Sequence, residues 1–175
     1  MPNSLRHLWL LGLSGSGKST VGPLLAKALH LPCADTDSLI ALEAGKSIPE
    51  IFQAEGEEGF RKREDRALAR VAAGPSSVIS CGAGVVLREA NRKCLASTGL
   101  RVYLKSDPAT LSQRLHSAKD RPLLQGACAE KALARQLADR SPWYEESEIQ
   151  IDVSRLDPAA VVAAIRRQLP APWSR

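Results

Sequence analysis

Gly12-Leu13-Ser14-Gly15-Ser16-Gly17-Lys18-Ser19 is the stretch that decides the fold, and it follows the pattern G-x-x-x-x-G-K-[ST]. Glycines at both ends allow the backbone to curl so tightly that consecutive N–H groups point inward, toward the oxygens of a bound phosphate. In this pattern the lysine reaches the outer phosphates and the serine hydroxyl binds Mg²⁺. The helix that begins here adds the positive end of its dipole. The stretch therefore predicts a triphosphate site that is served by Lys18 and Ser19.

The residues on either side of this loop have the order strand, loop, helix that such a site requires. Leu8-Trp9-Leu10-Leu11 is a short apolar run, which is typical of a buried parallel strand. After the loop, apolar residues recur at the spacing of one helix face: Val21, Leu24, Leu25, Ala28 and Leu29. Pro23 lies beyond the first turn, and we expect it to kink this helix. The alternative, a glycine-rich turn without a ligand, leaves Lys18 and Ser19 without a role.

Composition indicates one domain that binds small anionic molecules. The chain of 175 residues is long enough for one well-packed domain and too short for two. No apolar run is long enough to cross a membrane and the N-terminus has no signal-peptide pattern, so we expect a cytoplasmic protein without a membrane partner. The cysteines and histidines show no metal-ligand or disulfide spacing. A net charge of +5 would also suit nucleic acid, but the basic residues are scattered and aromatic residues make up only 4%. We therefore expect a strongly anionic small-molecule partner and no nucleic acid.

Further apolar runs predict the other strands, at residues 31–34, 78–81, 100–104 and 149–153. Helical segments are expected from the capping box of Ser47 and Glu50 onward, over 57–73 after an interruption by Gly56 and Gly59, and over 88–97. Others are expected from Pro108, over 130–140 with an end at Ser141-Pro142, and over 158–169. Strand and helix alternate five times, which predicts an α/β fold with a five-stranded parallel sheet covered on both faces.

Two carboxylates follow the second predicted strand. Asp35 and Asp37 stand at i and i+2, so on an extended segment they would point to the same face, about 7 Å apart. Ligands of open parallel sheets bind at the carboxyl ends of the strands. Both acids are therefore expected to face the same crevice as the phosphate loop. The alternative is that Asp37 only caps a helix that begins at Ser38.

A glycine loop and several cations complete the set of candidates. Gly82-Ala83-Gly84 directly follows a predicted strand and would allow close approach to a ligand, although a plain tight turn is an alternative. No aspartate closes that strand, so Asp35 is the expected substitute for the second metal-side carboxylate. Arg61, beside the core-facing Phe60, is the best-placed cation for an acidic substrate. Residues 117–126 break the helical pattern and are expected to form a lid that carries Arg121.

Taken together, these motifs resemble the shikimate kinases, which are members of the nucleoside-monophosphate-kinase-like group of P-loop enzymes. The resemblance runs from about Leu8 to Leu169. It rests on these stretches, in order: 12–20, Asp35-Thr36-Asp37, 56–61, Gly82-Ala83-Gly84, Arg121-Pro122-Leu123-Leu124, and Arg140 before Ser141-Pro142-Trp143-Tyr144. It implies a single three-layer α/β/α domain with the architecture of a P-loop kinase, in which residues 34–62 bind substrate and residues 117–127 form a mobile lid.

The resemblance also implies an activity: transfer of the γ-phosphate of ATP to the 3-hydroxyl of shikimate, giving shikimate 3-phosphate on the route to chorismate and the aromatic amino acids. The cofactor would be Mg²⁺ and the protein a monomer. The catalytic residues would be Lys18, Asp35, Asp37 and Arg121. The ATP-binding residues would be Ser14, Gly15, Ser16, Gly17, Lys18, Ser19, Thr20, Arg114, Arg121 and Pro158. The shikimate-binding residues would be Asp37, Arg61, Gly82, Ala83, Gly84 and Arg140, and the metal-site residues Ser19 and, through water, Asp35.

Two positions depart from the family pattern. The family usually has three glycines where this chain has Gly82-Ala83-Gly84, and a positive φ at Ala83 would cost roughly 1 kcal/mol or more. Pro23 stands where a basic residue is usual.

Two other functions remain as alternatives: a kinase of another polyhydroxy acid such as gluconate, and a nucleotide-binding regulatory module without catalysis.

Overall fold

The computed structural model describes residues 6–116, 127–171 and 173. Within them lies the predicted five-stranded parallel sheet, in the order β2-β3-β1-β4-β5. The strands are β1 (His7–Leu11), β2 (Cys33–Asp35), β3 (Val78–Ser80), β4 (Gly99–Lys105) and β5 (Ile149–Asp152). The helices are α1 (Lys18–Leu29), α2 (Thr36–Ala44), α3 (Ile48–Ala72), α4 (Glu89–Thr98), α5 (Pro108–His116), α6 (Ala127–Tyr144) and α7 (Pro158–Gln168), with a 3-10 turn η1 (Val85–Leu87) before α4.

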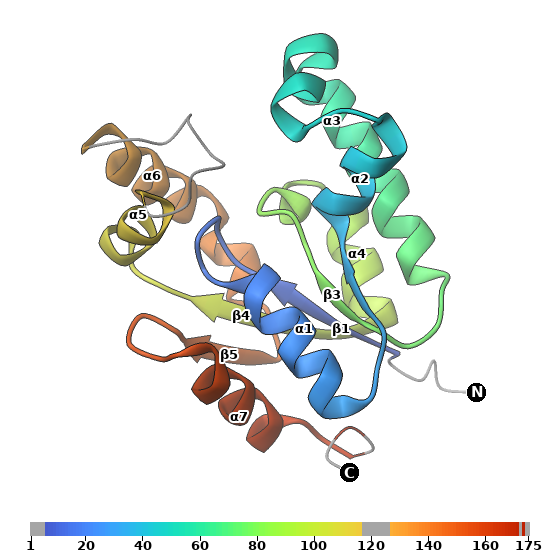
Figure 1. Cartoon of the computed structure of the whole chain (residues 1–175), viewed down its shortest axis with the longest axis vertical. Coiled ribbons are helices and arrows are strands. Elements are labelled where there is room, and N and C mark those ends of the chain that lie inside the picture. Colours follow the sequence, from blue (N-terminus) through green and yellow to red (C-terminus); the bar gives the residue numbers. More distant parts are fainter. Residues whose placement is uncertain (1–5, 117–126, 172, 174–175) are drawn as a thin grey trace.

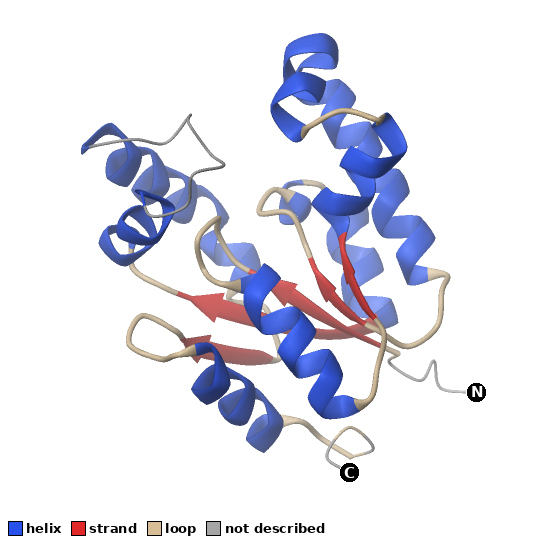
Figure 2. Cartoon of the chain, viewed as in Figure 1, coloured by secondary structure: helices blue, strands red, loops and turns tan. Residues whose placement is uncertain are grey.

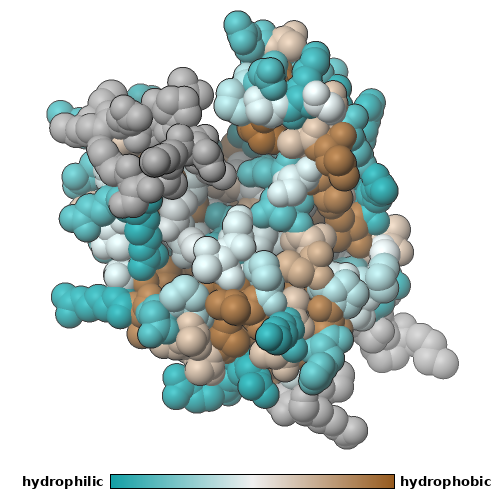
Figure 3. Space-filling view, in the orientation of Figure 1, coloured by the Kyte–Doolittle hydropathy of each residue, from teal (hydrophilic) through white to brown (hydrophobic). Residues whose placement is uncertain are grey.

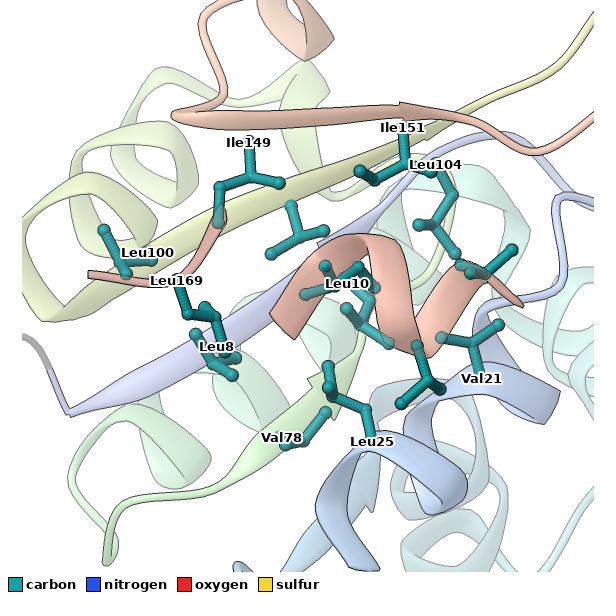
Figure 4. Packing of buried hydrophobic residues seen from close by; sticks show 14 of the residues in the cluster. Leu8, Leu10, Val21, Leu25, Val78, Leu100, Leu104, Ile149, Ile151 and Leu169 are labelled. Atoms are coloured by element: carbon teal, nitrogen blue, oxygen red, sulfur yellow. The ribbon is translucent and has the colours of Figure 1, made fainter. Parts of the chain in front are cut away.

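The central strand β1 divides the hydrophobic core into two parts, because alternate side chains of a strand point to opposite faces of the sheet. Leu8 and Leu10 pack with residues of α1 and α7 on one face (Figure 4). Trp9 and Leu11 pack with residues of α3, α4, α5 and α6 on the other face. Every residue of β1 is buried, as expected for a strand inside a parallel sheet. The three layers that result are visible in Figures 1 and 2 and confirm the predicted α/β/α architecture.

A smaller cluster of Ile40, Ile51, Phe60 and Ala67 joins α2 to α3. These two helices project beyond the edge of the sheet, next to β2 and β3 (Figure 1). The capping box of Ser47 and Glu50 begins α3 as predicted. Gly56 interrupts this helix with a φ of 68°, whereas Gly59 remains helical, so only one of the two expected interruptions occurs.

Helix α1 runs through Pro23 to Leu29, as the apolar spacing of the sequence predicted. The predicted end of another helix was wrong. Helix α6 continues through Pro142 to Tyr144 instead of ending near Arg140. The ring of Tyr144 is fully buried and stacks on Tyr103, and this packing stabilises the last turn against the proline. The predicted lid, including Arg121, lies outside the described residues. Within the described residues, no helix is long and apolar enough to span a membrane.

Candidate active site

The loop from Gly12 to Gly17 connects β1 to α1 and has the backbone geometry of a phosphate cradle. Gly15 and Gly17 have φ values of 85° and 93°, in the left-handed region that favours glycine. Gly17 is the N-cap of α1, so the first turn of that helix opens at the loop. A helix N-terminus presents N–H groups and a positive dipole end, which together attract an anion.

Lys18 is the first residue of α1, and its amine lies at the loop. Its Nζ donates hydrogen bonds to the carbonyl oxygens of Gly12 (2.7 Å) and Leu13 (2.9 Å). The side chain is largely buried, with 9% exposed. A buried ammonium held by carbonyl dipoles is positioned for a phosphate with little further loss of side-chain entropy.

Ser19 and Asp35 meet beside the loop, as the sequence predicted. The Ser19 hydroxyl donates to Asp35 Oδ2 at 2.9 Å, and Asp35 Oδ1 accepts from the Ser38 backbone N–H at 3.0 Å. Asp35 is therefore the N-cap of α2, and Asp37 lies in the first turn of that helix. The expectation that both acids lie on an extended segment was wrong, and so was the alternative in which Asp37 is the cap, because the strand ends two residues earlier.

Two adjoining cavities lie along the phosphate loop, and both include Gly17, Thr20 and Arg114 in their linings. The larger cavity has a volume of about 470 Å³ and is lined by Ser14, Gly15, Gly17, Lys18, Ser19, Thr20, Asp35, Asp37, Cys81, Ala83, Arg114 and Leu115. It therefore brings together the phosphate loop, both predicted carboxylates and Ala83, whereas Arg61 and Arg140 are not among the residues that line it. Figure 3 shows this face of the molecule, on which the part built from α2 and α3 stands out above the part that holds the sheet.

The smaller cavity, of about 220 Å³, continues from Ser16 and Gly17 toward the start of α7. Its wall is mostly apolar, and it is lined by Ser16, Gly17, Thr20, Val21, Arg114, Val153, Leu156, Pro158 and Val161. Arg114 Nη2 donates to the Val153 carbonyl oxygen at 2.7 Å, which holds the guanidinium at the cavity wall. Arg114 and Pro158 thus line the same cavity.

Arg61 is held beside the Gly82–Gly84 loop by a carboxylate that the sequence reasoning missed. Its Nη1 donates to Glu64 Oε2 at 2.8 Å, and the Glu64 side chain is 1% exposed. Burial raises the pKa of Glu64, with Arg61 opposing the shift and Asp37 adding to it. Glu64 Oε1 and Arg61 Nε are buried without a hydrogen-bond partner in the described part of the chain. Such atoms indicate a site that is completed by a polar ligand.

The two glycines of this loop allow close approach of side chains, and neither has a positive φ. A Cβ on Gly84 would lie 2.1 Å from Arg61 Nη1, and a Cβ on Gly82 would lie 2.7 Å from Asp37 Oδ1 and 2.9 Å from Glu64 Oε1. Among the described residues only His30 is a non-glycine with positive φ, so Ala83 does not incur the strain that such a conformation would cost. Gly82 N–H donates to Thr36 Oγ1 at 2.9 Å, which fastens the loop to α2.

Ala83 is connected to α6 through its carbonyl oxygen. This oxygen accepts hydrogen bonds from the Tyr144 hydroxyl at 2.5 Å and from Arg140 Nη1 at 3.3 Å. Arg140 is thereby placed at the loop. Tyr144 was missed, although it follows Arg140 by one helical turn and an aromatic residue at that spacing falls on the same helix face.

The chain was compared with known proteins. The sequence profile of the shikimate kinase family matches residues 14–170. A shikimate kinase from Symbiobacterium thermophilum is 44% identical over 166 residues, which covers 93% of this chain and 95% of the relative. A solved shikimate kinase from Acinetobacter baumannii, in complex with shikimate, is 34% identical with a TM-score of 0.87 and covers 93% of this chain and 92% of its own. A gluconokinase from Sinorhizobium meliloti is more distant, at 19% identity and a TM-score of 0.62 over 91% of this chain and 89% of its own, and that likeness shows the fold alone.

Proposed function

Because the chain belongs to the shikimate kinase family, we propose that it transfers the γ-phosphoryl group of ATP to the 3-hydroxyl of shikimate. The observation that carries this proposal is the cavity of about 470 Å³, which is lined by the phosphate loop, Asp37 and Ala83. A phosphoryl donor and an alcohol acceptor must meet in one cavity from which water is excluded. The product, shikimate 3-phosphate, leads toward chorismate and the aromatic amino acids.

On the donor side, Lys18 and the amides of the loop would hold the phosphates, with adenine between Arg114 and Pro158. Ser19 and Asp35 fit a magnesium ion, because a hydroxyl and a carboxylate lie 2.9 Å apart beside the loop and Mg²⁺ prefers oxygen ligands. When bound, Mg²⁺ neutralises charge on the β- and γ-phosphate oxygens. Ser19 would bind it directly and Asp35 through its waters.

On the acceptor side, Asp37 would accept hydrogen bonds from the shikimate hydroxyls and take the proton of the 3-hydroxyl. The oxygen so activated forms a bond to the γ-phosphorus, the bond from that phosphorus to the β–γ bridging oxygen breaks, and ADP leaves. Arg61 and Arg140 would bind the shikimate carboxylate, since the planar guanidinium group matches a carboxylate in bidentate geometry. Arg121, which lies outside the described residues, would neutralise the transferring phosphoryl group.

The two arginines distinguish this proposal from a kinase that does not recognise an acid. We expect Arg61→Ala and Arg140→Ala each to raise the KM for shikimate by about tenfold or more, with a much smaller effect on the KM for ATP, because a charge-assisted hydrogen bond contributes about 1.5–3 kcal/mol. Arg63→Ala is the matched control, since Arg63 lies in the same helix and pairs with Glu55 at 2.7 Å. An unchanged KM for shikimate in both variants would refute the carboxylate site.

The alternatives make different predictions in the same steady-state ADP-release assay. A gluconate kinase would turn over gluconate in preference to shikimate. A regulatory module would bind ATP and turn over neither acid. The hydrogen-bonded pair of Ser19 and Asp35 and the buried amine of Lys18 favour a catalytic site over such a module.

A further inference from the structure

The Gly82–Gly84 loop is held by groups from three helices. Thr36 of α2 accepts from the Gly82 N–H, the guanidinium of Arg61 of α3 lies where a Gly84 side chain would be, and Tyr144 and Arg140 of α6 both donate to the Ala83 carbonyl oxygen. Each of these contacts fixes the peptide groups that face the larger cavity. The position of the loop is therefore shared among α2, α3 and α6.

The two donors on the Ala83 carbonyl are not equivalent. The Tyr144 hydroxyl lies at 2.5 Å and its ring is fully buried, whereas Arg140 Nη1 lies at 3.3 Å on a partly exposed side chain. Tyr144 is also fixed by its ring, which stacks on Tyr103 with 5.0 Å between the centroids. Burial raises the pKa of Tyr144 above its usual range, so the phenol stays protonated and remains a donor. The phenol is thus the permanent donor, and the guanidinium is the one that is free to move.

We infer that Tyr144 is a positioning residue of the acceptor site, which keeps the Ala83 carbonyl satisfied when Arg140 turns toward the carboxylate of the bound acid. The inference rests on the proposed function, because it assigns Arg140 to that carboxylate. Without the phenol, a departing Arg140 would leave a partly buried carbonyl oxygen without a protein partner, and an acceptor that is shielded from water and unsatisfied is costly. The Ala83 carbonyl oxygen and the substrate carboxylate would then compete for the guanidinium of Arg140. The phenol acts through Arg140 and the loop and needs no contact with the substrate itself.

The hydroxyl can be removed without the ring. Tyr144→Phe keeps the stack on Tyr103 and deletes only the donor. Tyr103→Phe is the matched control, because it keeps the same stack and deletes a hydroxyl that makes no hydrogen bond to the loop in the described part of the chain. Both variants keep the ring of a buried tyrosine and remove its hydroxyl, so the hydrogen bond to the Ala83 carbonyl oxygen is the difference between them.

The test combines steady-state kinetics for both substrates with thermal melting, and each variant is assayed below its melting midpoint. In Tyr144→Phe we expect the KM for shikimate to rise about fivefold, which is the effect of losing one net hydrogen bond. The KM for ATP is expected to stay within about twofold of its value in the unaltered protein. Tyr103→Phe is expected to leave both KM values unchanged. Equal KM values for shikimate in Tyr144→Phe and the unaltered protein would overturn the inference, as would an equal rise in both variants.

The failure of the proposed function is distinguishable from the failure of this inference. If the unaltered protein does not phosphorylate shikimate, the proposed function fails and the role of Tyr144 fails with it. If the unaltered protein turns over shikimate while Tyr144→Phe loses only melting temperature, the function stands and the phenol has a purely structural role.

Discussion

Gly84→Ala is the substitution that most directly tests the geometry beside the loop. A Cβ at this position would lie 2.1 Å from Arg61 Nη1 and 2.5 Å from Cζ and Nη2. The closest contact must lengthen to at least 3.0 Å, a limit that real Cβ contacts respect. The guanidinium has little room to move, because its side chain is only 11% exposed and is paired with the buried Glu64. The alanine therefore displaces the guanidinium of Arg61 from its place beside Gly84.

The expected size follows from what Arg61 contributes. A hydrogen bond to a charged group is worth about 1.5–3 kcal/mol, which corresponds to about a 10- to 150-fold change in affinity. We expect the KM for shikimate to rise within that range in a coupled ADP-release assay, while the KM for ATP changes little because the contact is remote from the phosphate loop.

A double-mutant cycle shows whether the effect passes through Arg61. In the Arg61→Ala background the new methyl group has no guanidinium to displace, so Gly84→Ala should change the KM for shikimate by no more than about twofold. A full additional loss in that background would refute the reasoning. A KM for shikimate that Gly84→Ala leaves unchanged on its own would refute it as well.

Three further predictions concern the carboxylate, the phosphate loop and the buried histidine. Asp37→Asn should lower kcat by about 100-fold or more without a fall in melting temperature, and a near-native kcat would remove Asp37 as the base. Gly17→Ala should weaken ATP binding, measured by titration calorimetry, through backbone strain alone, because φ at this position is 93° and no atom lies within 4 Å of the added Cβ. An unchanged affinity for ATP would contradict this prediction. Burial lowers the pKa of His7, so its contribution to stability is present above about pH 6.5 and is lost as the pH falls below it. His7→Gln should flatten that pH dependence in urea unfolding, and an unaltered profile would contradict the assignment.

The parts of the fold that were predictable are those with a local signal. The apolar run before Gly12, the glycine spacing of the loop and the amphipathic stripe of α1 depend only on residues near in sequence. The boundaries that were wrong depend on tertiary packing: α6 continues through Pro142 because the buried ring of Tyr144 stabilises its last turn. Asp35 became the helix cap because the strand ends at Asp35, whereas the sequence reasoning extended it to Asp37.

The candidate site shows the same division. Lys18, Ser19, Asp35 and Arg61 stand in motifs, and the structure brings them to the same edge of the sheet. Glu64 stands in no motif, and Tyr144 was quoted only within the stretch after Arg140, without a role. Each matters through a neighbour that the fold brings near: Arg61 for Glu64 and the Ala83 carbonyl oxygen for Tyr144. The close approach of charged side chains to the two glycines could not be predicted from the sequence, because these side chains come from helices distant along the chain. Gly82 lies against Asp37 and Glu64, and Gly84 lies against Arg61.

The central claim is that a phosphoryl donor and a hydroxy acid meet in the larger cavity. The direct measurement is ADP release with Mg-ATP, run separately with shikimate and with gluconate at equal concentration. The account predicts turnover with shikimate and none with gluconate, which would also show that Ala83 is compatible with activity. ATP binding without turnover of shikimate would contradict it.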